Sequence, residues 1–94
     1  MVKVFWTDLA IQDLRSIFDY ISKDSQGYAT EQVERLINRV DQLENFPESG
    51  RIVPEFNLDD TRELIEGSYR IVYEVTPSSV RILRIHHSAR LLDL

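Results

Sequence analysis

The side chains that could do chemistry in this chain are concentrated in its second half, and nearly all are arginine, histidine or glutamate. They are Arg51, Glu55, Arg62, Glu63, Arg70, Arg81, Arg84, His86, His87 and Arg90. Residues of these types can cleave RNA without a metal, because a carboxylate or histidine takes the 2′-hydroxyl proton while an arginine stabilises the phosphorane charge. A second histidine or acid then protonates the leaving oxygen. For this chemistry the candidate catalytic residues are Arg70, His87 and Glu55.

Each of these three residues also has an ordinary structural explanation. Arg70 lies within the segment Tyr69–Tyr73, and an exposed arginine is common on one face of a sheet. Glu55 follows a proline in a predicted loop, where a solvated carboxylate is the usual case. His86 and His87 are neighbours on a predicted strand, so they point to opposite faces and cannot both join one site. The residues alone therefore indicate a candidate arginine and histidine site and leave its activity open.

Other catalytic and binding signatures are absent from the sequence. There is no glycine-rich phosphate loop, no zincin-type ligand spacing and no Gly-x-Ser-x-Gly elbow. The chain has no cysteine, which excludes disulfides, a thiolate nucleophile and cysteine-based metal sites. We therefore expect neither a cofactor nor a metal.

Length and composition predict one domain that spans residues 1–94. The apolar fraction of 43% is too high for intrinsic disorder, and 29% of the residues are charged. No apolar run is long enough to cross a bilayer. The short apolar stretch at residues 1–6 is soon interrupted by Asp8, so we do not expect it to be a signal peptide. These features predict a cytoplasmic protein without a membrane partner.

The formal net charge of −5 is unevenly distributed along the chain. Residues 1–50 hold five basic and nine acidic side chains, whereas residues 51–94 hold six basic and seven acidic ones. Residues 81–92 contain three arginines, two histidines and no acid. An acidic protein is poorly suited to a dense phosphate field. Because the C-terminal segment is locally basic, the net charge alone does not exclude a function linked to nucleic acid.

Hydrophobic periodicity predicts two amphipathic helices after a short strand at residues 2–6. Thr7 is the expected N-cap of the first helix, whose apolar side chains recur at three- and four-residue spacing over residues 10–21. A polar break at residues 22–27 separates it from a second apolar stripe over residues 29–43. Two such helices with a short connection form an antiparallel hairpin.

Three further strands are predicted at residues 62–66, 69–75 and 80–87, while residues 45–60 are the least regular part of the chain. The resulting order is β-α-α-β-β-β. This order predicts an α+β fold in which the N-terminal strand and the helical hairpin pack on an antiparallel sheet.

A four-residue turn between the last two strands predicts their register. The expected pairs are Val75 with Val80, Tyr73 with Ile82 and Ile71 with Arg84. Because side chains alternate between faces, this register places Arg70 and His87 on one face, away from the helices. A slip by one residue would exchange the two faces.

Several short motifs occur in a characteristic order along the chain. They are Ala10-x-x-Asp13-Leu14-x-x-Ile17-x-x-Tyr20-Ile21, Pro47-x-x-Gly50-Arg51-x-Val53-Pro54-Glu55, Arg62-Glu63-Leu64, Tyr69-Arg70-Ile71-Val72-Tyr73 and Ile85-His86-His87-Ser88-Ala89-Arg90. Each is weak alone, but in this order and spacing the sequence resembles the RelE/ParE superfamily of bacterial type II toxin–antitoxin toxins over nearly its full length. The resemblance implies the same β-α-α-β-β-β order.

The resemblance also implies a function and a partner. It implies a growth-inhibiting toxin that a cognate antitoxin holds inactive in a hetero-oligomer. ParE-like members inhibit DNA gyrase, whereas RelE-like members are ribosome-dependent mRNA endonucleases. Arg70 matches a strand arginine that both branches share. His87 and Arg90 match the His-x-x-Arg ending of ParE-like and related plasmid-stabilisation proteins.

Two departures from the RelE-like pattern favour the gyrase interpretation. The two lysines, Lys3 and Lys23, lie far from the C-terminal site, whereas RelE-like nucleases usually carry a basic cleft. No tyrosine follows Tyr73 to stack on an mRNA base.

The expected target-binding residues are Arg81, Arg84, His87 and Arg90, with Arg70 in a supporting role. Two alternatives stay open: an mRNA endonuclease acting on the ribosome, and a relic that only binds its antitoxin. The chain would be an enzyme, a metal-free endoribonuclease, only in the first of these alternatives.

Overall fold

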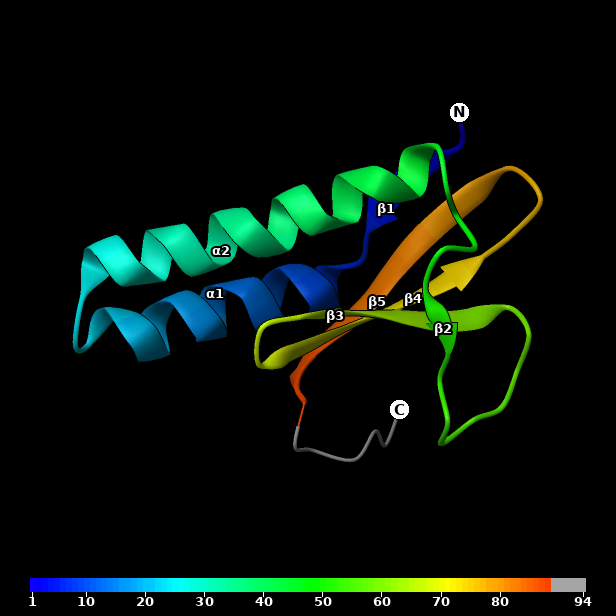
Figure 1. Cartoon of the computed structure of the whole chain (residues 1–94). Helices are drawn as coiled ribbons and strands as arrows, with labels where there is room; N and C mark the ends of the chain where they lie inside the picture. Colours follow the sequence, from blue (N-terminus) through cyan, green and yellow to red (C-terminus); the bar gives the residue numbers. More distant parts are fainter. Residues whose placement is uncertain (89–94) are drawn as a thin grey trace.

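A helical hairpin lies against one face of a five-stranded sheet in the computed structural model, which describes residues 1–88 (Figure 1). The elements are β1 (Lys3–Trp6), α1 (Asp8–Ser22), α2 (Gln26–Asp41), a 3₁₀ turn (Gln42–Glu44), β2 (Arg51–Ile52), β3 (Thr61–Glu66), β4 (Tyr69–Val75) and β5 (Ser79–His87). The predicted α+β class, with a strand, two helices and then an antiparallel sheet, is confirmed.

The strand order in the sheet is β1-β5-β4-β3-β2. β1 pairs with β5 in parallel, and the other neighbours are antiparallel. A parallel pair needs a long crossover connection, which the helices and the strands between β1 and β5 provide here. The short strand β2 falls in the region predicted to be irregular. Two residues are too few to show a periodicity, so the sequence pattern could not reveal it.

Thr7 joins the start of α1 to the sheet. Its Oγ1 accepts a hydrogen bond from the Ala10 amide at 3.2 Å, as an N-cap should, and donates to the Ile82 carbonyl at 2.7 Å. Ser25 caps α2 in the same way by accepting from the Tyr28 amide at 3.1 Å. The predicted N-cap at Thr7 and the polar break between the helices are therefore confirmed.

The main core lies between the hairpin and the sheet. Its buried side chains are Ala10, Leu36, Val40, Leu43, Leu64, Ile71, Tyr73, Val80, Ile82 and Ile85. Each large aliphatic side chain removed from water contributes about 1.5–3 kcal/mol. The closed end of the hairpin extends past the sheet (Figure 1), and Tyr20 and Tyr28 near this end are 72% and 58% exposed.

An irregularity in the pairing of β4 with β5 changes the faces of the last strand. Tyr73 lies opposite Ile82 as predicted, but the register then shifts at Leu83, and Ile71 lies opposite Ile85. The predicted pair of Ile71 with Arg84 is therefore wrong. One extra residue in a strand transfers every later side chain to the other face, which is how Ile85 enters the core.

A second, smaller apolar cluster lies on the side of the sheet away from the helices. Val53 and Val72 are fully buried there, with Phe56 and Leu83 packed against them. Val53 and Phe56 belong to the segment between β2 and β3, so this segment folds over the sheet. Its position brings the neighbouring residue Glu55 next to β4.

Gly50 lies where the chain enters β2 and has no room for a side chain. Its amide donates to the buried Tyr73 hydroxyl at 2.8 Å. A Cβ atom at this position would lie 2.5 Å from the Glu63 carbonyl oxygen and 2.5 Å from the Tyr73 hydroxyl. The close approach of three strands therefore requires glycine here.

We expect Gly50→Ala to lower the free energy of unfolding by about 1–3 kcal/mol, because the added methyl group overpacks this contact. Urea denaturation measures the change. Gly27→Ala is the matched control, since a Cβ there would meet nothing closer than 3.9 Å. The control should leave stability unchanged or raise it by up to about 1 kcal/mol. Equal stability of the two variants would contradict the packing described here.

Candidate functional site

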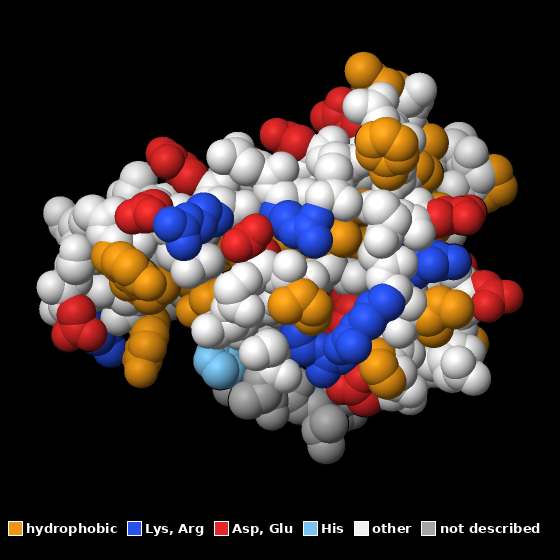
Figure 2. All heavy atoms as spheres, viewed as in Figure 1, with side chains coloured by type: hydrophobic (Ala, Val, Ile, Leu, Met, Phe, Trp, Pro, Cys, Tyr) orange, Lys and Arg blue, Asp and Glu red, His pale blue; other side chains and the backbone are white. Residues whose placement is uncertain are grey.

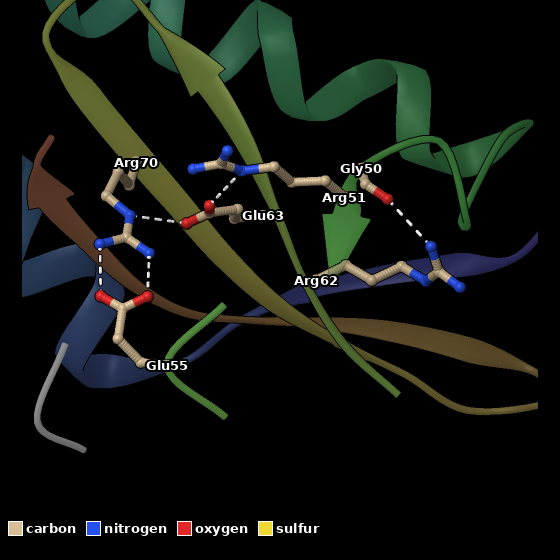
Figure 3. A network of polar contacts seen from close by, with 6 residues as sticks. All are labelled: Gly50, Arg51, Glu55, Arg62, Glu63 and Arg70. Carbon is tan, nitrogen blue, oxygen red and sulfur yellow. Dashed lines mark hydrogen bonds and ion pairs between the residues drawn. The ribbon is translucent and has the colours of Figure 1, made fainter. Parts of the chain in front are cut away.

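Arg70 on β4 is held by two carboxylates. Its Nε donates to Glu63 at 2.6 Å, and its two terminal nitrogens donate to the two carboxylate oxygens of Glu55, each at 2.7 Å (Figure 3). The Arg70 side chain is only 6% exposed. The guanidinium of the candidate catalytic arginine is thus buried, and each of its three nitrogens donates a hydrogen bond to a glutamate.

Glu63 on β3 is the most deeply buried charge of this network. Its side chain is 0% exposed and lies between Arg70 and Arg51, whose Nε donates to the other carboxylate oxygen at 2.5 Å. Buried carboxylates are tolerated only when they are paired and hydrogen-bonded. The network therefore alternates in sign from Arg51 through Glu63 and Arg70 to Glu55, and its four charges cancel.

These contacts determine the charge state of Arg70. The hydrogen bond with Glu55 raises the pKa of the guanidinium above its usual value, and Glu63 adds to this effect against the opposing effect of burial. Arg70 is therefore a permanent cation and cannot transfer a proton. As an electrophile it would have to offer N–H groups to a phosphorane, and in this arrangement its Nε and both terminal nitrogens donate to glutamates.

The structure brings Glu55, but not His87, into contact with Arg70. The shifted register places His86, which is 8% exposed, opposite Arg70 on the neighbouring strand. His87 instead lies opposite Tyr69, and the two rings meet edge to face at 5.8 Å between centroids. The prediction that Arg70 and His87 share a face is therefore wrong. No local sequence signal marks the register shift, so sequence reasoning selected the other histidine.

Two of the predicted target-binding residues, Arg84 and His87, line one hollow, whereas Arg81 is not part of its lining. Arg81 is 53% exposed and lies 3.4 Å from Glu74, the cross-strand partner predicted for it. Arg84 is engaged by Asp13 of α1, and His87 lies near the other end of β5. Arg90 lies outside the described residues. Arg81 is thus the arginine of β5 that is presented to solvent.

Asp13 is a residue to which sequence reasoning gave no role. Its carboxylate accepts from Arg84 Nε at 2.9 Å and Nη2 at 3.1 Å, and also from the Ile85 amide at 2.9 Å. The pairing of β1 with β5 ends at Ile82, so Asp13 satisfies an amide on the strand edge beyond that point. The bond to Asp13 raises the pKa of Arg84. Only the Ala-x-x-Asp-Leu motif could have singled out this aspartate.

A hollow of about 570 Å³ lies between the overhanging hairpin and the ends of β4 and β5. Its aromatic lining comes from both layers: Tyr20, Tyr28, Tyr69, His86 and His87. Burial raises the pKa of the Tyr69 hydroxyl. Figure 2 shows hydrophobic side chains, a class that includes tyrosine there, protruding at this end of the hairpin. A concave surface with this lining is suited to binding a protein segment.

Within residues 1–88, no group of three potential ligands is placed to hold a metal ion. No helix in the same part of the chain has the length and apolar character needed to cross a membrane.

Comparisons with known proteins give one consistent family. A family described as "ParE toxin of type II toxin-antitoxin system, parDE" matches residues 4–92. A Caulobacter vibrioides protein named Toxin RelE2 is 39% identical over 92 residues, which are 97% of this chain and 100% of that protein.

Solved structures show the same fold. A structure titled as the chromosomal ParDE toxin–antitoxin system from P. aeruginosa has a TM-score of 0.77 at 26% identity, over 93% of this chain and 96% of that one. The toxin–antitoxin complex RelBE2 from Mycobacterium tuberculosis has a TM-score of 0.60 at 22% identity, over 92% and 96%.

We expect Arg70→Ala to lower the free energy of unfolding by about 3 kcal/mol or more, because it removes a partner from a fully buried carboxylate. Chemical denaturation monitored by circular dichroism measures this loss. Arg35→Ala is the control, since Arg35 forms an exposed ion pair with Glu31 on α2. The control should cost no more than about 0.5 kcal/mol. Similar losses for the two variants would show that the network contributes no more than a surface pair.

Proposed function

The chain belongs to the ParE toxin family of type II toxin–antitoxin systems, and on that basis we propose that it inhibits growth by binding DNA gyrase and is neutralised by a cognate antitoxin. The family match extends over almost the whole described structure and supports a toxin of the same size and architecture. The mechanism proposed is recognition of a target protein, without cleavage of RNA.

The observation that carries this proposal is the engagement of Arg70. A metal-free nuclease needs an arginine whose N–H groups face the phosphate that reacts. Here the same groups donate to Glu55 and Glu63. The candidate histidine, His87, lies on the other side of the sheet with Tyr69. This arrangement supports a binding protein better than the alternative of a RelE-like mRNA endonuclease on the ribosome.

The distribution of charge also supports this choice. Residues 1–50, which include the helical hairpin, hold nine acidic and five basic side chains. An acidic hairpin would be repelled by ribosomal RNA, and such repulsion slows association. Arg81 remains available at the exposed surface of β5 for contacts with a protein target.

The proposal of an antitoxin partner has both comparative and physical support. The similar structures from P. aeruginosa and Mycobacterium tuberculosis are described as a toxin–antitoxin system and a toxin–antitoxin complex. The hollow beneath the hairpin, with exposed Tyr20 and Tyr28, is a concave aromatic surface of the kind that binds partner segments. A toxin–antitoxin hetero-oligomer is therefore the proposed inactive state.

The test compares the two activities on one preparation of the toxin. We expect purified toxin to block supercoiling by gyrase and to cause accumulation of gyrase–DNA cleavage complexes. Primer extension on translated mRNA should show no toxin-dependent cuts. Normal supercoiling together with ribosome-dependent cuts would overturn the proposal in favour of the endonuclease. Normal supercoiling without cuts would favour a relic that only binds antitoxin.

Arg81 provides a second, residue-level prediction. We expect Arg81→Ala to weaken gyrase inhibition several-fold, because losing a charge at the rim of an interface slows association. Arg35→Ala is the matched control, since its side chain is similarly exposed and also pairs with a glutamate, but lies on α2. Concentration series in the supercoiling assay measure both variants. Equal inhibition by both would exclude Arg81 from the target surface.

A further inference from the structure

The outward face of β1 places an exposed aromatic ring beside two cations. We propose that Lys3, Phe5 and Arg81 form the surface through which the toxin binds its target, with Phe5 as the apolar anchor, and that the target offers an apolar pocket bordered by carboxylates. This inference rests on the proposed toxin function and names the part of the chain that contacts the target protein. We call these three residues the β1 patch.

The parallel pairing of β1 with β5 brings these residues together from opposite ends of the chain, at the edge of the sheet (Figure 1). Phe5 pairs with Arg81, and Lys3 pairs with Ser79. Paired positions point to the same face of a sheet, and so do alternate residues of one strand. All three side chains of the β1 patch therefore share a face. Because Val4, between Lys3 and Phe5, packs against the main core, this face is the one away from the helices.

Phe5 is a large apolar side chain that is open to solvent. It is 52% exposed, although its neighbours Val4 and Trp6 pack against the core. A single exposed apolar side chain is ordinary on a protein surface, so the groups around it decide what it can bind. An aromatic ring next to an arginine, with other polar groups at the rim, is the usual composition of a protein–protein contact.

Lys3 and Arg81 make the β1 patch locally basic in a chain whose net charge is −5. Arg81 is 53% exposed, and its partner Glu74 lies 3.4 Å away and is 34% exposed, so this ion pair is weak and can be exchanged for another. Among the ion pairs of residues 1–88, none includes Lys3. An acidic partner is therefore attracted to the β1 patch and repelled by the acidic helical hairpin, which selects its orientation during docking.

The backbone that carries the β1 patch is fixed at both ends of β1. The Val2 amide donates to the Glu44 carbonyl at 3.0 Å, and the Thr7 amide donates to the Ile82 carbonyl at 3.1 Å. A preformed surface loses little conformational freedom on binding, so more of the contact free energy appears as affinity.

The composition of the β1 patch suits a protein better than a nucleic acid. Affinity for nucleic acid comes mainly from many contacts between cations and phosphates. The β1 patch supplies two cations, and the carboxylate of Glu74 beside Arg81 would repel a phosphate backbone. A protein target needs only a few complementary charges around an apolar centre. We therefore assign the β1 patch to an acidic protein surface.

The experiment compares variants of the purified toxin in the gyrase supercoiling assay. We expect Phe5→Ser to raise the toxin concentration for half-inhibition about tenfold, because removal of an aromatic anchor leaves its pocket unfilled. Lys3→Glu should also raise it about tenfold, because the new carboxylate repels those of the target. Lys3→Arg keeps the charge and should inhibit as the wild-type chain does.

The matched controls are Phe46→Ser and Lys23→Glu, which make the same changes elsewhere on the surface. Phe46 is 66% exposed in the loop after the 3₁₀ turn, and Lys23 is exposed at the end of α1. Both controls should inhibit gyrase as the wild-type chain does. Circular dichroism verifies the folding of each variant. Lys3→Glu changes an exposed side chain and remains the test if Phe5→Ser does not fold.

Growth inhibition after expression without antitoxin separates this inference from the identity of the target. If the wild-type toxin inhibits growth but not gyrase, the gyrase proposal fails, and loss of toxicity in Phe5→Ser and Lys3→Glu alone still supports the β1 patch. If these two variants inhibit growth and gyrase as strongly as the controls do, the β1 patch is overturned and the toxin function stands. A wild-type chain with neither activity overturns both.

A gel-shift assay with a duplex DNA fragment tests the other class of partner. We expect no shift by the wild-type toxin alone at concentrations that inhibit gyrase. A shift that Lys3→Glu abolishes would assign the β1 patch to nucleic acid and overturn the proposal.

Discussion

The burial of the Glu63 carboxylate is the constraint on which the rest of this sheet depends. A fully buried carboxylate is costly unless it is paired and hydrogen-bonded, and the structure supplies Arg51 from β2 and Arg70 from β4. These contacts join three strands through one side chain. They also orient Arg70 toward Glu55, so the segment between β2 and β3 is tied to the sheet by charge as well as by its apolar residues.

The arginines that resemble a catalytic set in the sequence have different roles in the folded chain. Arg70 organises the sheet, and Arg84 attaches β5 to α1 through Asp13. Arg81 alone among the described arginines of β5 is presented to solvent. The types and order of the residues are compatible with RNA cleavage, but in the folded chain Arg70 and Arg84 are each paired with carboxylates.

Local features of this fold could be predicted from the sequence, whereas features that depend on distant contacts could not. Thr7 could be identified as an N-cap because the signal lies within a few residues. The pairing of β5 with β4 could not be predicted beyond Leu83. With or without the extra residue, the sequence pattern allows apolar side chains to face the core, so the irregularity leaves no signal. Glu63 lies in Arg-Glu-Leu-Ile-Glu, where both glutamates look solvent-exposed. Its burial follows from the folded segment at residues 53–60, which carries no periodic pattern.

If the Arg70 guanidinium organises the structure and takes no part in the toxic activity, its replacement in a folded chain should leave that activity intact. The most direct measurement is growth inhibition and gyrase inhibition by the double variant Arg70→Met with Glu63→Leu, after its folding has been verified by thermal denaturation. Replacing a buried ion pair by apolar side chains of similar size is often tolerated. We predict that the folded double variant keeps both activities. A folded variant that inhibits neither growth nor gyrase would contradict this account.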